Sequence, residues 1–203
     1  MLSYKSTLIA VIVLFISACS PLQKRADIVI NPDLAWQERQ VQLRQLTTWE
    51  IRGRTAITQG KEAWNAGLNW HENAGHYHIK LMGPFSQGGI HLEGTPEQVI
   101  LTLSDGEMIA AATPEALLTK AFELKLPISA LRDWVRGLPY AGAPYQTLEI
   151  DDQGRLKYLE QQQWKVDYQR YETYGQQHMP SKLFISHPDF SVRLVINNWK
   201  DAQ

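Results

Sequence analysis

Apolar residues recur at every second position along most of the stretch from Thr48 to Ala111. In its first segment, Trp49, Ile51 and Ile57 share one phase, and mostly charged residues occupy the other. A period of two is typical of a β-strand that packs one face on a core and exposes the other to water. Since several such segments follow one another with turn residues between them, the pattern predicts an antiparallel sheet that forms a barrel or sandwich.

Two short helices are predicted where the alternation stops. Residues 113–122 begin with Thr113 as an N-cap and Pro114 in the first turn, which is a typical helix start. Residues 127–139 predict a second helix, which ends at Gly137. Strand patterns then resume. The expected fold is one continuous α+β domain, an incomplete (open) antiparallel β-barrel or strongly curved sheet with a helical cover over its mouth.

A further helix is expected at the start of the folded part, where Pro32 and Asp33 precede a segment rich in glutamine and arginine. Its apolar residues Leu34, Val41 and Leu46 predict the stripe that packs against the sheet.

The N-terminus follows the three-part plan of a secretory signal. A short polar start with Lys5 leads into the apolar run Leu8 to Ile16, which is shorter than the roughly 20 residues that span a bilayer. The next residues, "ISAC", end at Cys19, the only cysteine of the chain, and they resemble the lipobox of bacterial lipoproteins. An ordinary secretory signal or an uncleaved anchor is the alternative interpretation.

The lipobox resemblance implies cleavage after residue 18, an S-diacylglycerol group on Cys19 and a further acyl chain on its amino group. Ser20 in place of Asp implies sorting to the outer membrane. The expected organisation is a signal peptide over residues 1–18, the lipidated cysteine and a linker over 19–32, and a single domain over 33–203. No cofactor other than this covalent lipid is expected.

Charge and motifs exclude several classes of function. With 20 basic and 21 acidic residues, the chain lacks the basic footprint of a nucleic-acid-binding protein. The sequence contains no nucleophile elbow, phosphate-binding loop or dinucleotide fingerprint. His71 and His76 lie five apart across a predicted turn, not four apart on a helix, and His78 and His91 fit a solvated strand face. We therefore expect neither an enzyme active site nor a metal site.

Aromatic residues are numerous, with seven Trp and eight Tyr, and many of them fall in the inward phase of the strands. A packed core is the default interpretation of such a pattern. A curled sheet can also enclose a cavity, as lipocalin-sized barrels do, and such a cavity binds apolar ligands through burial. The sequence leaves both possibilities open.

Several segments resemble the LolB family of outer-membrane lipoprotein receptors. The most specific match is "LPISALRDWVRGLP" at residues 126–139. The matches also include "WEIRGR" at 49–54, "WKVDY" at 164–168, "MPSKL" at 179–183 and "NNW" at 197–199, all in the family's order. The loop "LMGPFSQ" at 81–87 is similar to the family's loop in which one apolar residue protrudes after a proline.

The resemblance implies an apolar cavity for acyl chains beneath the helical cover. It implies a receptor that accepts triacylated lipoproteins from a soluble LolA-like periplasmic carrier and releases them into the inner leaflet of the outer membrane, without nucleotide energy. Phe85 matches the protruding residue that the family needs to deliver cargo into the membrane. Folding of Phe85 back onto the barrel is the alternative. A monomer would suit a one-to-one transfer.

Candidate cavity residues follow from the inward phase of the strands and from the helical cover. Since a register error of one residue exchanges the two faces, the set depends on the phase. The candidates are Trp49, Ile51, Trp64, Leu68, Trp70, Tyr77, Ile79 and Ile90 from the strands, with Leu131 and Trp134 from the cover.

Two other functions remain compatible with the sequence. One is a lipid-anchored, lipocalin-like carrier of a small apolar ligand, which would need no partner protein. The other is a structural envelope lipoprotein with a fully packed core, which would contain no cavity.

Overall fold

The structure is a computed structural model that describes residues 31–83 and 89–200. Eleven strands within these residues form one antiparallel sheet with the order β6-β5-β4-β3-β2-β1-β11-β10-β9-β8-β7. The strands are β1 (Thr48–Gln59), β2 (Glu62–Asn73), β3 (His76–Met82), β4 (Gly89–Gly94), β5 (Val99–Thr102), β6 (Met108–Ala111), β7 (Tyr145–Ile150), β8 (Leu156–Gln161), β9 (Trp164–Tyr174), β10 (Gln177–His187) and β11 (Phe190–Lys200).

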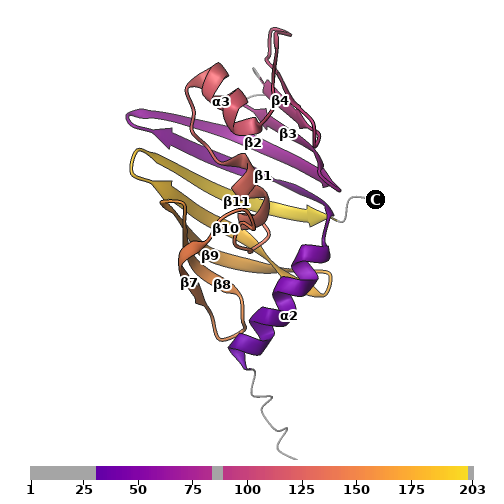
Figure 1. Cartoon of the computed structure of the whole chain (residues 1–203), viewed down its shortest axis with the longest axis vertical. Helices are drawn as coiled ribbons and strands as arrows, with labels where there is room; N and C mark the ends of the chain where they lie inside the picture. Colours follow the sequence, from indigo (N-terminus) through magenta and orange to yellow (C-terminus); the bar gives the residue numbers. More distant parts are fainter. Residues whose placement is uncertain (1–30, 84–88, 201–203) are drawn as a thin grey trace, which may run out of the picture.

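Each strand pairs with its sequence neighbour except at one step. The first strand and the last, β1 and β11, lie side by side at the centre of the sheet, and β6 and β7 form its two edges (Figure 1). The helices α3 (Pro114–Phe122) and α4 (Ile128–Trp134) connect these edges. The sheet is therefore an open, incomplete barrel, and the predicted α+β fold is confirmed.

The predicted strand phase is also confirmed. In β1 the side chains of Trp49, Ile51 and Thr55 are buried, whereas the alternate Arg52 and Arg54 are exposed. The register of β1 shifts by one residue against β11 just after Arg52. Gly53 occupies this shift because a Cβ atom there would collide with the backbone of β11 at Val195 and Ile196.

The N-terminal helix α2 (Pro32–Gln45) forms where expected, but its buried face differs from the predicted stripe. Trp36 and Leu43 are buried, whereas Leu34 and Val41 are 54% and 60% exposed. The prediction for Leu34 and Val41 was wrong, while Leu46 packs against the core. Both pairs are seven residues apart, so helical periodicity fits either one. Because tryptophan has the larger apolar area, the face that carries Trp36 and Leu43 is the one that packs.

The helical cover packs against the concave face of the sheet. Helix α3 starts at its N-cap Thr113, whose Oγ1 accepts a hydrogen bond from the backbone N–H of Ala116 at 3.2 Å. Helix α4 buries Leu131 and Trp134, and the chain turns after it at Gly137, which has a φ of 81°. In the described residues, no helix is both long and apolar enough to cross a membrane.

A fully buried glutamine on β8, Gln161, fixes the end of the cover. Its Oε1 accepts hydrogen bonds from Trp134 Nε1 at 3.0 Å and from the backbone N–H of Tyr140 at 2.9 Å. Its Nε2 donates to the carbonyl oxygens of Tyr140 at 2.8 Å and Ala143 at 2.6 Å. The amide therefore pairs with a buried indole N–H on α4 and with part-buried backbone groups in the turn after it.

Two arginines connect α4 and the turn after it to other elements. Arg132 forms an ion pair with the buried Glu72 of β2 and lies over the ring of Tyr77, 5.0 Å from its centroid. Arg136 donates to the carbonyl oxygens of Leu43 at 3.1 Å and Leu46 at 2.9 Å, at the C-terminal end of α2. The cover is thereby attached to the N-terminal strands and to α2 at once.

The hydrogen bonds of Gln161 predict that this residue is important for stability. We expect Gln161→Ala to lower the free energy of unfolding by about 2–4 kcal/mol, because it leaves buried donors and acceptors without partners. Urea denaturation measures this loss, with the exposed Gln169→Ala as the control. A change no larger than that of the control would contradict this role.

Candidate apolar binding cavity

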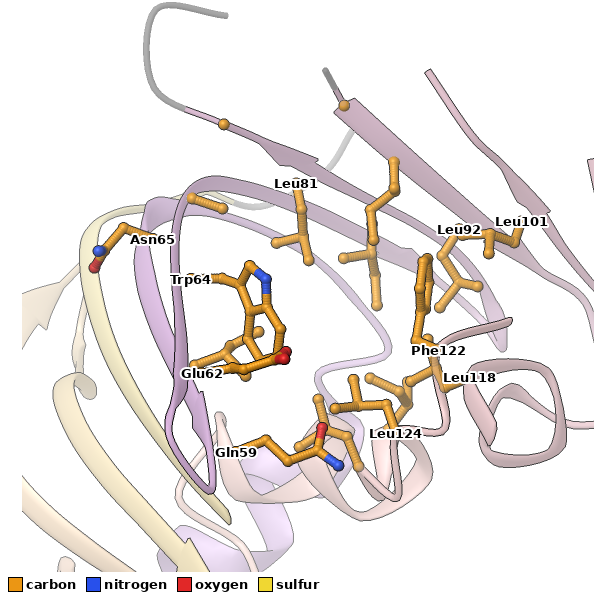
Figure 2. Close-up of a pocket in the computed structure, with 18 of the residues that line it drawn as sticks. Gln59, Glu62, Trp64, Asn65, Leu81, Leu92, Leu101, Leu118, Phe122 and Leu124 are labelled. Atoms are coloured by element: carbon orange, nitrogen blue, oxygen red, sulfur yellow. The ribbon is translucent and has the colours of Figure 1, made fainter. Parts of the chain in front are cut away.

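A cavity of about 790 Å³ lies at one end of the molecule, between the inner face of the N-terminal strands and the segment of α3 (Figure 2). This volume falls within the roughly 300–1,000 Å³ that is typical of ligand pockets. Most of its lining is apolar. The lining residues are Ile57, Gln59, Lys61, Glu62, Trp64, Asn65, Ala66, Ile79, Leu81, Gly83, Gly89, Ile90, Leu92, Leu101, Ser104, Leu118, Phe122, Glu123, Leu124, Leu126 and Ile128.

The strands supply one wall through their inward phase. Ile79 and Leu81 of β3 lie opposite Leu92 and Ile90 of β4 in the antiparallel register. Leu101 of β5, which is fully buried, extends this apolar surface toward the sheet edge. Because these residues alternate with outward-facing ones, consecutive strands present a continuous apolar surface to the cavity.

The other wall comes from α3 and the chain that follows it. Helix α3 ends at Glu123, which has a left-handed conformation with a φ of 55°. The backbone N–H of Leu124 then donates to the carbonyl oxygen of Leu118 at 3.3 Å, a C-terminal capping arrangement. This turn brings Leu124 next to the helix residues Leu118 and Phe122 on the same side of the cavity (Figure 2).

The cavity opens near the end of the β1–β2 hairpin. Trp64 and Phe122 lie on opposite sides of the open space and remain 45% and 40% exposed (Figure 2). Exposed apolar side chains that gather at the mouth of an apolar cavity often mark a binding site. The polar lining residues Gln59 and Glu62 come from the hairpin end. Such a site binds by removing apolar surface from water.

Ionisable groups on the strands next to the cavity residues include one buried tyrosine and one exposed pair. Burial raises the pKa of Tyr77 to about 12, against the opposing influence of Arg132. His78 faces Glu93 with Nδ1 and Oε1 3.4 Å apart, and both side chains are exposed. No group of three or more metal-ligating side chains occurs within residues 31–83 and 89–200.

Three of the ten predicted lining residues border the cavity, namely Trp64, Ile79 and Ile90. The other seven lie in the packed core instead and are Trp49, Ile51, Leu68, Trp70, Tyr77, Leu131 and Trp134.

These seven residues lie in the core because side chains fill the concave face of the sheet along part of its length. Trp49 packs against Trp70 at 5.4 Å and against Trp199 at 5.7 Å between ring centroids. Trp134 of α4 lies 6.2 Å from Trp164. These aromatic side chains occupy the space that the sequence-based prediction assigned to a ligand.

Several lining residues were absent from the predicted set. Leu81 and Leu92 share the inward phase of Ile79 and Ile90, so the same alternation could have identified them. Phe122 and its neighbours after α3 carry no comparable signal, because their position depends on how the helix packs. Cys19 and Phe85 lie outside the described residues.

An open antiparallel sheet with an apolar cavity beneath its helices defines a class of proteins that can bind apolar ligands. Similar solved structures include a LolA superfamily protein from Nitrosomonas europaea, with a TM-score of 0.53 and 8% identity over 86% of this chain and 95% of that one. A DUF1329 family protein from Desulfovibrio piger has a TM-score of 0.52 and 9% identity over 85% of this chain and 94% of that one. At such low identity these similarities concern the fold alone.

The sequence comparisons identify the family. The family model described as "Outer membrane lipoprotein LolB" matches residues 47–199. Similar relatives named outer-membrane lipoprotein LolB come from Nitrosococcus oceani, 34% identical over 96% of both chains, and from Alkalilimnicola ehrlichii, 35% identical over 93% of both. Another, from Ectopseudomonas mendocina, is 36% identical over 83% of this chain and 82% of its own. The chain belongs to the LolB family of outer-membrane lipoproteins, and the two alternative functions are not favoured.

The cavity predicts that apolar ligands bind at this end of the molecule. We expect Ile90→Asp to weaken the binding of a long-chain fatty acid about tenfold or more, because the ligand would desolvate the new carboxylate. Fluorescence titration with a labelled fatty acid measures the affinity. Met108→Asp introduces the same charge at a 65% exposed position outside the cavity lining and should leave binding unchanged. Equal binding by both variants would place the ligand elsewhere.

Proposed function

We propose that this protein accepts triacylated lipoproteins from a soluble LolA-like carrier and inserts them into the inner leaflet of the outer membrane. The observation that supports this most directly is the open apolar cavity in a member of the LolB family. Its lining is mostly apolar and offers burial to an acyl chain, which suits a role in binding and transfer.

The energetics of acyl chains require a protected route through the periplasm. Each methylene group that leaves an apolar site for water costs about 0.8 kcal/mol. A cargo protein with three acyl chains therefore moves only between sites that cover those chains. The sequence has no nucleotide-binding motif, so transfer runs downhill from carrier to cavity to bilayer.

The proposed lipid on Cys19 holds the receptor at its target membrane. Three acyl chains anchor a protein nearly permanently, whereas a single chain gives only marginal binding. A tether of this kind raises the effective concentration of the cavity next to the bilayer. Delivery then becomes a short, local step. The receptor acts as a monomer that takes one cargo molecule at a time.

We expect Cys19→Ser to abolish lipidation, because the thiol is the only group that can form the thioether to diacylglycerol. Mass spectrometry of the mature N-terminal peptide from the parent should find diacylglycerol and an additional acyl group on residue 19. The variant should carry neither and should lose its attachment to the outer membrane. An unmodified cysteine in the parent protein would contradict the anchor.

Phe85 is proposed to enter the membrane interface during delivery. An aromatic side chain suits the boundary between water and acyl chains. A charge at this position would oppose entry into the apolar part of the interface. Capture of cargo and delivery of cargo should therefore be separable.

We expect Phe85→Glu to capture cargo normally but to release it into membranes much more slowly. The assay uses an exported Cys19→Ala form of the protein, a lipoprotein-loaded carrier as donor and liposomes as acceptor, and it counts cargo at each stage. Phe85→Leu is the matched control and should deliver cargo like the parent. Failure of every form to remove cargo from the carrier would contradict the receptor function and favour a carrier of small apolar ligands or a structural role.

A further inference from the structure

A second depression, of about 490 Å³, lies on the outer face of the sheet, opposite the cavity side. We call it the outer groove. It crosses the central strands β1, β2, β3 and β11. Residues that line it include Arg54, Ala56, Gly67, Met82, Arg193 and Val195.

The outer groove arises because small residues lie between long ones on the outward phase. Gly67 of β2 pairs with Arg54 of β1 on one side and with Met82 of β3 on the other. Ala56 of β1 pairs with Arg193 of β11. The small side chains form the floor of the depression, and the two arginines and the methionine border it.

The two arginines have no anionic partner in the described part of the chain. Neither Arg54 nor Arg193 forms an ion pair there, and both are exposed. Other arginines on the sheet do have partners, since Arg52 pairs with Glu50 and Arg170 lies 3.3 Å from a carboxylate oxygen of Glu172.

Apolar surface adjoins these charges. Val195 lies directly opposite Arg54 in the register of β1 and β11, and Met82 is 44% exposed at the other border of the groove. Lys182 of β10 faces Val195 from the next strand and adds a further positive charge to this face. The groove therefore offers cationic and apolar surfaces side by side.

The outer groove adjoins the apolar cavity. Asn65, Ala66 and Gly83 line both. The pairing of β2 with β3 ends at Gly67 and Met82, so residues 62–66 extend beyond the last paired residue of β3. At this position an amphiphile can place a charged head on the outer face while its apolar part points toward the cavity.

We propose that the outer groove binds the phosphate headgroup of an anionic glycerophospholipid in the bilayer. Guanidinium groups match phosphate oxygens with paired hydrogen bonds, and an arginine keeps its charge at every physiological pH. The adjoining Met82 and Val195 suit the apolar part of the lipid next to its head. The combination favours a phospholipid over a free anion, which has no apolar part. Because the family is one of outer-membrane lipoproteins, a phospholipid of the bilayer is close to the groove.

The bound headgroup would orient the receptor on the membrane. With the phosphate between Arg54 and Arg193, the shared residues Asn65, Ala66 and Gly83 lie at the lipid surface, and the cavity end faces the bilayer. The inference goes beyond the proposed transfer function. It rests on that function only for the attachment to the membrane.

The test is native mass spectrometry of the full, lipidated protein in detergent with added phosphatidylglycerol or phosphatidylcholine. We expect the parent to bind phosphatidylglycerol in preference to phosphatidylcholine. Arg54→Gln combined with Arg193→Gln should weaken phosphatidylglycerol binding about tenfold or more, because two charge-assisted contacts are lost. Arg52→Gln, on the same face but paired with Glu50, is the matched control and should bind like the parent.

A second variant fills the groove without changing charge. A Cβ atom at Gly67 meets only the carbonyl oxygen of Met82 at an ordinary 3.7 Å, so a side chain can start here without a backbone collision. We expect Gly67→Val to reduce lipid binding as well, because its side chain fills the groove, and valine also has a high propensity for strands. Thermal unfolding of each variant checks that the fold is retained.

Three results would overturn the proposal: equal binding of both lipids by the parent, undiminished binding by the double arginine variant, or full competition by inorganic phosphate, which would indicate a free-anion site. Cargo capture from the carrier is measured in parallel. If the parent protein fails to capture cargo, the transfer function is contradicted, whether or not the phospholipid binds.

Discussion

Burial of the α4 segment against the concave face of the sheet is the constraint on which the rest of this structure depends. A curved sheet with one apolar face must cover that face. Here Trp134 and its neighbours cover part of it, and the fully buried Gln161 satisfies the polar groups that this packing removes from water. Without that amide, the buried indole N–H of Trp134 and part-buried backbone groups of the turn after α4 would lose their partners. A buried group without a partner costs more than the net gain of a typical hydrogen bond.

The same constraint explains why the cavity lies at one end. The apolar face of the N-terminal strands continues past the start of α4 at Ile128, where α3 and Leu124 approach it without filling the space. Apolar surface that no side chain covers is available to a ligand. Trp64 and Phe122 at its borders remain partly exposed, which suits the proposed binding and release of an acyl chain.

The sequence predicted the fold more fully than the site. The alternation of Trp49 and Ile51 fixed the inward phase correctly, but it could not distinguish a side chain that meets another aromatic ring from one that meets empty space. Both kinds of side chain are apolar and point inward. The helix α2 illustrates the same ambiguity, since Trp36 with Leu43 and Leu34 with Val41 have identical spacing, and only packing against the sheet selects between them.

The sequence by itself determined the strands, their inward and outward faces, the positions of the two cover helices and, through its family motifs, the LolB family. These properties follow from local periodicity, capping and motif order, which neighbouring residues specify. Only the tertiary structure decided which inward residues form core and which line the cavity, and it alone brought Arg54 and Arg193 to one groove. Such contacts join strands that are distant in the chain, and their geometry depends on the register of the sheet and the packing of the helices upon it.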